Sequence, residues 1–174
     1  ATHQYCEDLG VLRTIPGLTV ISPADAVEAY AAIEAVLKMD GPVYVRLGRY
    51  SVPVVFDKET YKFQAGKAVP VCDGDDAVVF ATGIMLAAAL EAKDILAAEG
   101  INISVVNVHT IKPIDKETVV KYATKTGRVV TAEEHTIVGG LGSAVAEVLS
   151  ENAPTRMKRV GMNDCFGRSA PAGE

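Results

Sequence analysis

Residues 77–108 read AVVFATGIMLAAALEAKDILAAEGINISVVNV, and this stretch decides the fold class. The continuous apolar run 77–81 is typical of a strand buried on both faces. Thr82-Gly83 forms a turn, and apolar residues then recur at helical spacing until Gly100. A second apolar run, 101–108, predicts another strand. A strand, a helix and a strand joined by short connections predict a parallel pair.

The same alternation extends in both directions. Toward the C-terminus we expect strands near residues 128–132 and 159–162, with helices from Asp115 to about 123 and over 140–149. A short strand is expected at 68–71. Residues 67–174 are therefore predicted to form a complete α/β domain, with an about five-stranded, mostly parallel sheet flanked by helices.

Residues 1–50 predict only part of a domain. Strands are expected at 18–21 and 43–47, and between them a helix with Ser22 as its cap and Pro23 in its first position. Its apolar stripe comprises Ala26, Ala29, Tyr30, Ile33, Val36 and Leu37. Two parallel strands cannot cover both of their faces, so this partial βαβ segment is expected to belong to a larger domain, in a fragment or a subunit of a split enzyme. Residues 51–66 are expected to be the linker.

Composition excludes several classes of protein. The net charge of −5 and the lack of a Lys/Arg cluster argue against nucleic-acid binding. No apolar run approaches the roughly 20 residues that a membrane helix needs. Cys6, Cys72 and Cys165 are odd in number and far apart, which fits a reducing cytoplasm better than a disulfide framework.

Arg46 stands near the end of the predicted strand 43–47, and Arg49 lies just past it. Polar groups at the carboxyl ends of parallel strands are the default site positions in an α/β sheet, and a guanidinium there can hold a phosphate. The alternative is that both arginines form surface or interdomain ion pairs.

Two further segments carry polar side chains. His3, followed by Gln4, has the chemistry to bind hydroxyls or to transfer protons near neutral pH, and the alternative is a solvated chain terminus. Glu133-Glu-His135 and Gly139-Gly-Leu-Gly142 stand at a predicted strand-to-helix junction. The glycines favour either anion binding at a helix N-terminus or close packing, in the domain or at a subunit contact. No second cluster completes a metal site.

Several motifs, in order, resemble the C-terminal part of transketolase. These are Thr2-His-Gln-Tyr-Cys-Glu-Asp8, Ile15-Pro-Gly-Leu-Thr-Val-Ile-Ser-Pro-Ala-Asp25, Arg46-Leu-Gly-Arg49 before Val52-Pro53, Ala81-Thr-Gly83, Thr110-Ile-Lys-Pro-Ile-Asp115 and Glu133-Glu-His135 with Gly139-Gly-Leu-Gly142. The resemblance covers essentially the whole chain. It implies that residues 1–50 end a pyrimidine-binding domain and that 67–174 form the C-terminal domain.

The resemblance also implies a function. Transketolases are transferases of the pentose phosphate pathway that move a two-carbon ketol unit between sugar phosphates, using thiamine diphosphate and Mg²⁺. His3 would contact the substrate and Arg49 would hold its phosphate, whereas no residue here would bind the cofactor or the metal. A cytoplasmic homodimer completed by an N-terminal subunit or domain is expected, and this chain alone is expected to be inactive.

Three alternatives stay open. Deoxyxylulose-phosphate synthase shares the Glu133-Glu-His135 pattern, although it would be expected to read Tyr-Pro-Arg-Gly where Arg46-Leu-Gly-Arg49 stands. The β subunit of 2-oxo-acid dehydrogenases resembles the chain more weakly. The third alternative is a non-catalytic dimerisation module, with residues 133–142 at a subunit contact.

Overall fold

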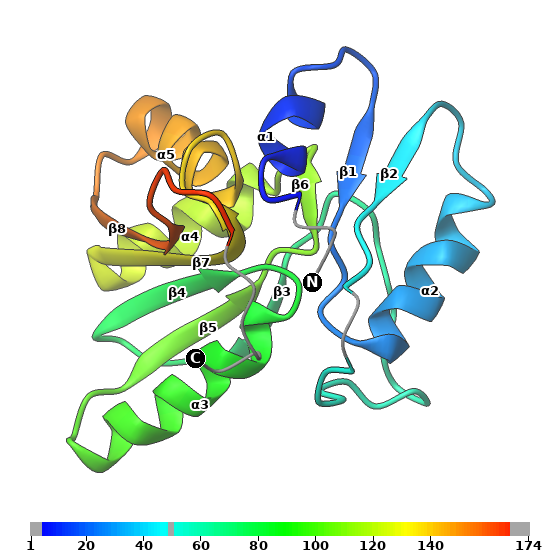
Figure 1. Cartoon of the computed structure of the whole chain (residues 1–174). Coiled ribbons are helices and arrows are strands. Elements are labelled where there is room, and N and C mark those ends of the chain that lie inside the picture. Colours follow the sequence, from blue (N-terminus) through cyan, green and yellow to red (C-terminus); the bar gives the residue numbers. More distant parts are fainter. Residues whose placement is uncertain (1–4, 49–50, 168–174) are drawn as a thin grey trace.

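The computed structural model describes residues 5–48 and 51–167, and it divides them between two sheets (Figure 1). The N-terminal segment contains α1 (Asp8–Arg13), β1 (Thr19–Ile21), α2 (Ala26–Val36) and β2 (Val43–Val45). Strands β1 and β2 pair in parallel, with Thr19 opposite Val43. This arrangement confirms the predicted βαβ crossover.

The C-terminal region forms the larger, five-stranded sheet, in the order β3-β5-β4-β7-β8. Only β3 runs antiparallel to its neighbour. The fold class is therefore the predicted one, a mostly parallel sheet flanked by helices. Its elements are β3 (Val69–Cys72), β4 (Ala77–Ala81), α3 (Met85–Ala98), β5 (Ile103–Asn107), α4 (Lys116–Thr126), β7 (Arg128–Thr136), α5 (Leu141–Asn152) and β8 (Arg156–Met162).

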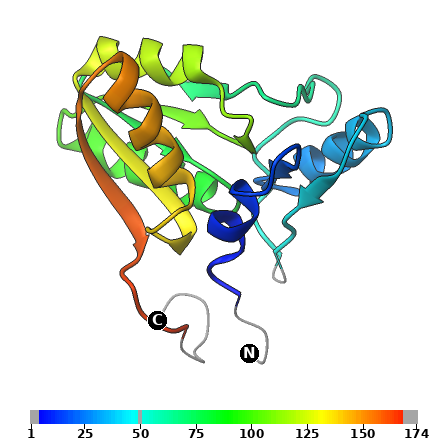
Figure 2. The ribbon, with the colours of Figure 1, turned by 90° about the horizontal axis from the view of Figure 1, so that it is seen from above.

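Alternation along β4 explains why both faces of this sheet are covered. Val78 and Phe80 point into the cluster beneath α4 and α5, whereas Ala81 belongs to the cluster beneath α3. Each face of the strand is therefore apolar, as the continuous run 77–81 predicts for a central parallel strand. Figure 2 shows α3 on the opposite side of the sheet from α4 and α5.

The sequence analysis missed one strand, β6 (Thr110–Lys112). It leaves the C-terminal region and pairs antiparallel with β1, which gives the smaller sheet the order β2-β1-β6. It reads Thr-Ile-Lys, with a single apolar residue, whereas the equally short β1 and β2 belong to apolar runs, so hydrophobic patterning did not mark β6. Through β6 the two parts of the chain share a sheet.

Helix α2 differs from its prediction in its start and in its buried face. Asp25, not Ser22, is the cap, and its Oδ1 accepts a hydrogen bond of 2.8 Å from the Glu28 N–H. The predicted apolar stripe faces outward, with Tyr30 63% and Leu37 80% exposed, while Glu28 and Ala32 are buried. An amphipathic pattern predicts a face that some partner covers, and the described part of this chain does not cover it.

None of the helices in the described residues is both long enough and apolar enough to cross a membrane.

Candidate functional site

The site begins where β1 and β2 end. After Ile21 the chain turns into α2, and after Val45 it continues through Leu47 and Gly48. The Arg46 N–H donates to the Ile21 carbonyl at 2.8 Å, which extends the parallel pairing by one residue. The carboxyl edge of the pair is thus the place where an α/β sheet of this kind binds ligands.

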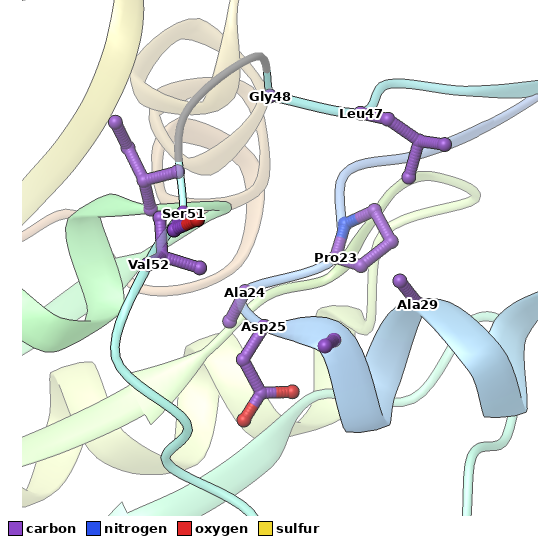
Figure 3. Close-up of a pocket in the computed structure, with 10 residues that line it drawn as sticks. Pro23, Ala24, Asp25, Ala29, Leu47, Gly48, Ser51 and Val52 are labelled. Atoms are coloured by element: carbon purple, nitrogen blue, oxygen red, sulfur yellow. The ribbon is translucent and has the colours of Figure 1, made fainter.

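A cavity of about 380 Å³ lies at this edge (Figure 3). It is bounded by the start of α2, by the loop after β2 and, from the C-terminal domain, by Ile84. Its lining is mostly apolar, and Asp25 and Ser51 carry the polar side chains among the described residues. The lining residues are Pro23, Ala24, Asp25, Ala26, Ala29, Leu47, Gly48, Ser51, Val52 and Ile84.

Asp25 organises one wall of this cavity. Besides capping α2 through Oδ1, its Oδ2 accepts hydrogen bonds from the N–H groups of Val55 at 2.7 Å and Phe56 at 2.9 Å. Both oxygens are therefore engaged in holding the returning chain against the start of α2. Asp25 is a structural carboxylate, because neither oxygen is left to bind a ligand without giving up backbone donors.

The two predicted substrate-binding residues, His3 and Arg49, lie outside the described residues. Residues 49 and 50 stand in the sequence between two described residues, Gly48 and Ser51, which both line the cavity. The described lining contains no Lys or Arg side chain. Recognition of an anion in this cavity would therefore need a cation from elsewhere, and Arg49 is adjacent in sequence.

Arg46 forms two ion pairs, one of them between the domains, which was one of the two roles predicted for the arginines. Its Nε lies 2.9 Å from Asp8 Oδ2 in α1, and one terminal nitrogen lies 3.1 Å from Glu134 Oε2 in β7. The Tyr44 hydroxyl also donates to Asp8 Oδ2, at 2.8 Å. Burial, together with the hydrogen bond to Asp8, raises the pKa of Tyr44 to about 12. Asp8 and Tyr44 were not singled out from the sequence, where no local spacing links them.

Residues 133–142 have a structural explanation. The buried Glu133 carboxylate accepts the N–H groups of Leu141 at 2.6 Å and Gly142 at 2.8 Å, and so satisfies the start of α5. A Cβ on Gly140 would collide with that carboxylate and lie 2.6 Å from His135 Nδ1. The glycines therefore permit close packing of helix on strand within the domain, which was one of the predicted alternatives.

His135 links the two domains. Its Nε2 accepts the Gly10 N–H at 3.2 Å, and its Nδ1 lies 2.6 Å from the Thr136 carbonyl oxygen. These partners require the tautomer that carries its proton on Nδ1. Gly139, with φ of 82°, touches Gly10, since a Cβ on Gly139 would lie 3.0 Å from the Gly10 Cα.

A second buried polar cluster joins α2, the linker and β5. Glu28 Oε1 accepts from Asn107 Nδ2 at 2.7 Å and from the Tyr61 hydroxyl, and Oε2 accepts the Ala24 N–H at 2.7 Å. Burial raises the pKa of the Glu28 carboxyl, although these three hydrogen bonds oppose the change. Sequence reasoning missed this cluster. The available signal was an acid within an otherwise alanine-rich helix.

The described residues do not fit a thiamine diphosphate or Mg²⁺ site. Within 5–48 and 51–167, no group of three His, Cys, Asp or Glu side chains comes together as metal ligands. The cavity lining described above offers a diphosphate no cationic side chain, and its carboxylate is already engaged.

Comparisons with known proteins identify the family. Residues 1–54 match the transketolase pyrimidine-binding domain, and residues 66–174 match the transketolase C-terminal domain. The chain belongs to the transketolase family. It is thus part of a family of transferases, and the motifs that resembled transketolase are correctly assigned.

Individual relatives agree with this assignment. A 6-deoxy-6-sulfo-D-fructose transketolase subunit from Clostridium sp. (strain MSTE9) is 50% identical over 166 residues, which are 95% of this chain and 51% of that protein. An apulose-4-phosphate transketolase subunit from Phocaeicola vulgatus is 40% identical over 94% of this chain and 52% of its own length. This chain therefore spans about half the length of these curated relatives.

A solved structure and a more distant relative complete the comparison. The structure is of a split gene transketolase, an inactive beta4 tetramer, and it superposes with a TM-score of 0.94 at 49% identity, covering 97% of this chain and 55% of that one. A 1-deoxy-D-xylulose-5-phosphate synthase from Heliobacterium modesticaldum is 39% identical over 95% of this chain and 26% of its own length.

Proposed function

We propose that this chain forms one wall of the active site of a complete transketolase, which transfers a two-carbon ketol unit between sugar phosphates. The observation that carries the proposal is the cavity at the carboxyl edge of β1 and β2, because Arg49 follows directly on its lining residue Gly48. Membership of the family across both matched segments supports it.

Two residues of this chain have proposed roles toward the substrate. Arg49 fixes the phosphate end, since a guanidinium forks onto phosphate oxygens. His3 hydrogen-bonds the sugar's carbonyl or hydroxyl groups. The mostly apolar lining of the cavity favours this division of roles, because its described residues supply shape but no positive charge.

The substrate class is a ketose with an anionic group at its far end. The two relatives are named for 6-deoxy-6-sulfo-D-fructose and for apulose 4-phosphate, which both fit that description. For this chain we propose a phosphorylated ketose. An assay of ketol transfer should therefore compare pentose phosphates with a sulfonated sugar as substrates.

The remainder of the site is proposed to come from an N-terminal subunit or domain, which supplies the residues that bind thiamine diphosphate and Mg²⁺. The outward-facing stripe of α2, with Tyr30 63% and Leu37 80% exposed, supports this, because apolar faces of that kind are normally covered in the assembled protein. The complete enzyme is proposed to be a homodimer of such units, and this chain alone to be inactive. A cytoplasmic location stays a prediction.

Reconstitution tests the proposal. The complete enzyme, assembled with its N-terminal partner, thiamine diphosphate and Mg²⁺, should transfer ketol units from a ketose phosphate to an aldose phosphate, while this chain alone should not. Absence of turnover with every phosphorylated and sulfonated ketose tried would contradict the proposed activity. Turnover by this chain alone would contradict only the need for a partner.

The role of Arg49 has its own test in the complete enzyme. Arg49→Ala should raise the apparent KM for phosphorylated ketoses about tenfold or more, because a charge-assisted pair to the phosphate is lost. Lys58→Ala is the matched control, since Lys58 is an exposed cation of the linker that does not line the cavity. An unchanged KM in Arg49→Ala would remove this role.

The synthase alternative is tested in the same assay. The relative named 1-deoxy-D-xylulose-5-phosphate synthase is 39% identical, against 50% for the 6-deoxy-6-sulfo-D-fructose transketolase subunit, and Arg46-Leu-Gly-Arg49 stands where the synthase family would be expected to read Tyr-Pro-Arg-Gly. Formation of 1-deoxy-D-xylulose 5-phosphate in place of ketol transfer would favour that alternative.

A further inference from the structure

Four side chains near the exit of β2 form a network that the predicted substrate roles do not use. Asp8, 1% exposed in the first turn of α1, accepts from the Tyr44 hydroxyl at 2.8 Å and from Arg46 Nε at 2.9 Å. Arg46 also donates to Glu134 Oε2 at 3.1 Å. Asp8, Tyr44, Arg46 and Glu134 are called the exit clamp below, because they surround the point where the chain leaves β2.

The exit clamp fixes this point from two directions. The Arg46 backbone N–H is bound to the Ile21 carbonyl at 2.8 Å, while the Arg46 side chain is held by α1 on one side and by β7 on the other. The next two residues, Leu47 and Gly48, line the cavity, and the chain then reaches Arg49. The Asp8 carboxylate is therefore one of three groups that hold this exit, together with the Ile21 carbonyl and the Glu134 carboxylate.

Stability alone does not account for this arrangement. Taking a carboxylate and a guanidinium out of water costs about as much as their attraction returns, so a buried pair contributes little net stability. One Asp8 oxygen, Oδ1, is buried without a hydrogen-bond partner among the described residues, which adds to the cost. What Asp8 does provide is a fixed orientation for two side chains at the end of β2, those of Tyr44 and Arg46.

We propose that Asp8 is a positioning residue for substrate binding: through Arg46 and Tyr44 it helps to fix the exit of β2, whose next residues, Leu47 and Gly48, line the cavity and precede Arg49 in the sequence. The inference rests on the proposed function, and it adds to that function a residue that never touches the substrate. The same contacts place α1, the helix that follows His3 in the sequence, against β2. Asp8 thus ties together both segments that carry the proposed substrate contacts.

Two substitutions test this in the complete enzyme with its N-terminal partner, thiamine diphosphate and Mg²⁺. Asp8→Ala removes both hydrogen bonds and the charge, and we expect the KM for a phosphorylated ketose to rise about tenfold while kcat changes less than about threefold. Asp8→Asn keeps an acceptor for Tyr44 and Arg46, because its NH₂ group can occupy the position of the unpartnered Oδ1. It should fold normally and raise the KM about threefold.

Glu147→Gln is the matched control, because it breaks another interdomain ion pair, Arg13 to Glu147 at 2.7 Å, in which no residue near the cavity takes part. Its KM and kcat should equal those of the wild type. An unchanged KM in a folded Asp8→Asn enzyme would overturn the inference, as would an equal rise in the control, which would indicate a general loosening between the domains. A wild-type assembly without ketol transfer overturns the proposed function itself, and this inference with it.

Discussion

At the scale of single residues, the buried carboxylate of Glu28 is a group whose ionisation couples folding to pH. It is fully buried, and it accepts three hydrogen bonds. The donors are the Ala24 N–H just before α2, the Tyr61 hydroxyl in the linker and Asn107 Nδ2 in β5. Burial nevertheless raises its pKa above the usual range. The folded protein therefore holds a proton on Glu28 more tightly than the unfolded chain does.

The sign of the pH effect follows from linkage. Stability from this group is greatest below the unfolded pKa of about 4.3, and it falls as the pH rises through the window up to the raised folded pKa. Glu28→Gln removes the ionisation. Its free energy of unfolding should rise relative to that of the wild type as the pH increases from 4 to 8, measured by urea unfolding at several pH values.

The substitution is tolerable because a flip of the Asn107 amide brings its Oδ1, an acceptor without a partner among the described residues, to the new amide N–H, while the glutamine oxygen keeps the Ala24 N–H. Glu34→Gln, at an exposed position of the same helix, is the control and should leave the pH profile unchanged. Parallel profiles for Glu28→Gln and the wild type would show that Glu28 does not titrate differently in the folded state. Other ionisable groups cancel in the comparison.

Residue roles were predictable only where a motif carries them. The arginines after strand 43–47 were recognised, but sequence spacing could not distinguish Arg46, which forms two ion pairs, from Arg49. The partners of Arg46 are 38 and 88 residues away in the chain. Contacts at such separations are set by tertiary packing, which local periodicity does not encode.

At the scale of elements, the start of α5 depends on Glu133. Glu133→Ala leaves the N–H groups of Leu141 and Gly142 buried without acceptors, and each orphaned donor is costly. The free energy of unfolding should fall by about 2 to 4 kcal/mol, seen as a lower urea midpoint with an unchanged m value. Glu151→Ala, exposed at the other end of α5, should cost less than about 0.5 kcal/mol, and an equal loss in both variants would contradict the capping role.

Elements with strong periodicity were predicted, and those without it were not. Strand β4 was placed at its observed bounds, because five consecutive apolar residues between turn signals have few other interpretations. Strand β6 was missed, and the burial of Glu28 on the face of α2 away from its apolar stripe was not predicted. In both cases the deciding contact comes from a distant part of the chain, β1 for β6, and Asn107 with Tyr61 for Glu28.

At the scale of the whole molecule, the two domains are packed as one body. Figures 1 and 2 show α1 lying beside α5 and the end of β7. A small apolar cluster spans the boundary and contains Leu9, Val20, Ile111 and Ala144. Arg13 adds a hydrogen bond of 2.7 Å to the Gly139 carbonyl, and β6 pairs with β1. Unfolding of one part therefore exposes buried surface of the other.

Substitution of Leu9 tests this coupling. Leu9 is 1% exposed at the centre of the boundary cluster, so Leu9→Ala should lower the free energy of unfolding by about 2 to 4 kcal/mol. Hydrogen exchange should show peptides from residues 19–45 and from β4 and β7 losing protection together, because shared contacts make the opening cooperative. Val11→Ala, in the same helix but 51% exposed, is the control and should change protection in neither part. Loss of protection confined to residues 19–45 would show that the smaller sheet opens independently, and that its attachment to the C-terminal domain is weaker than β6 and the boundary cluster indicate.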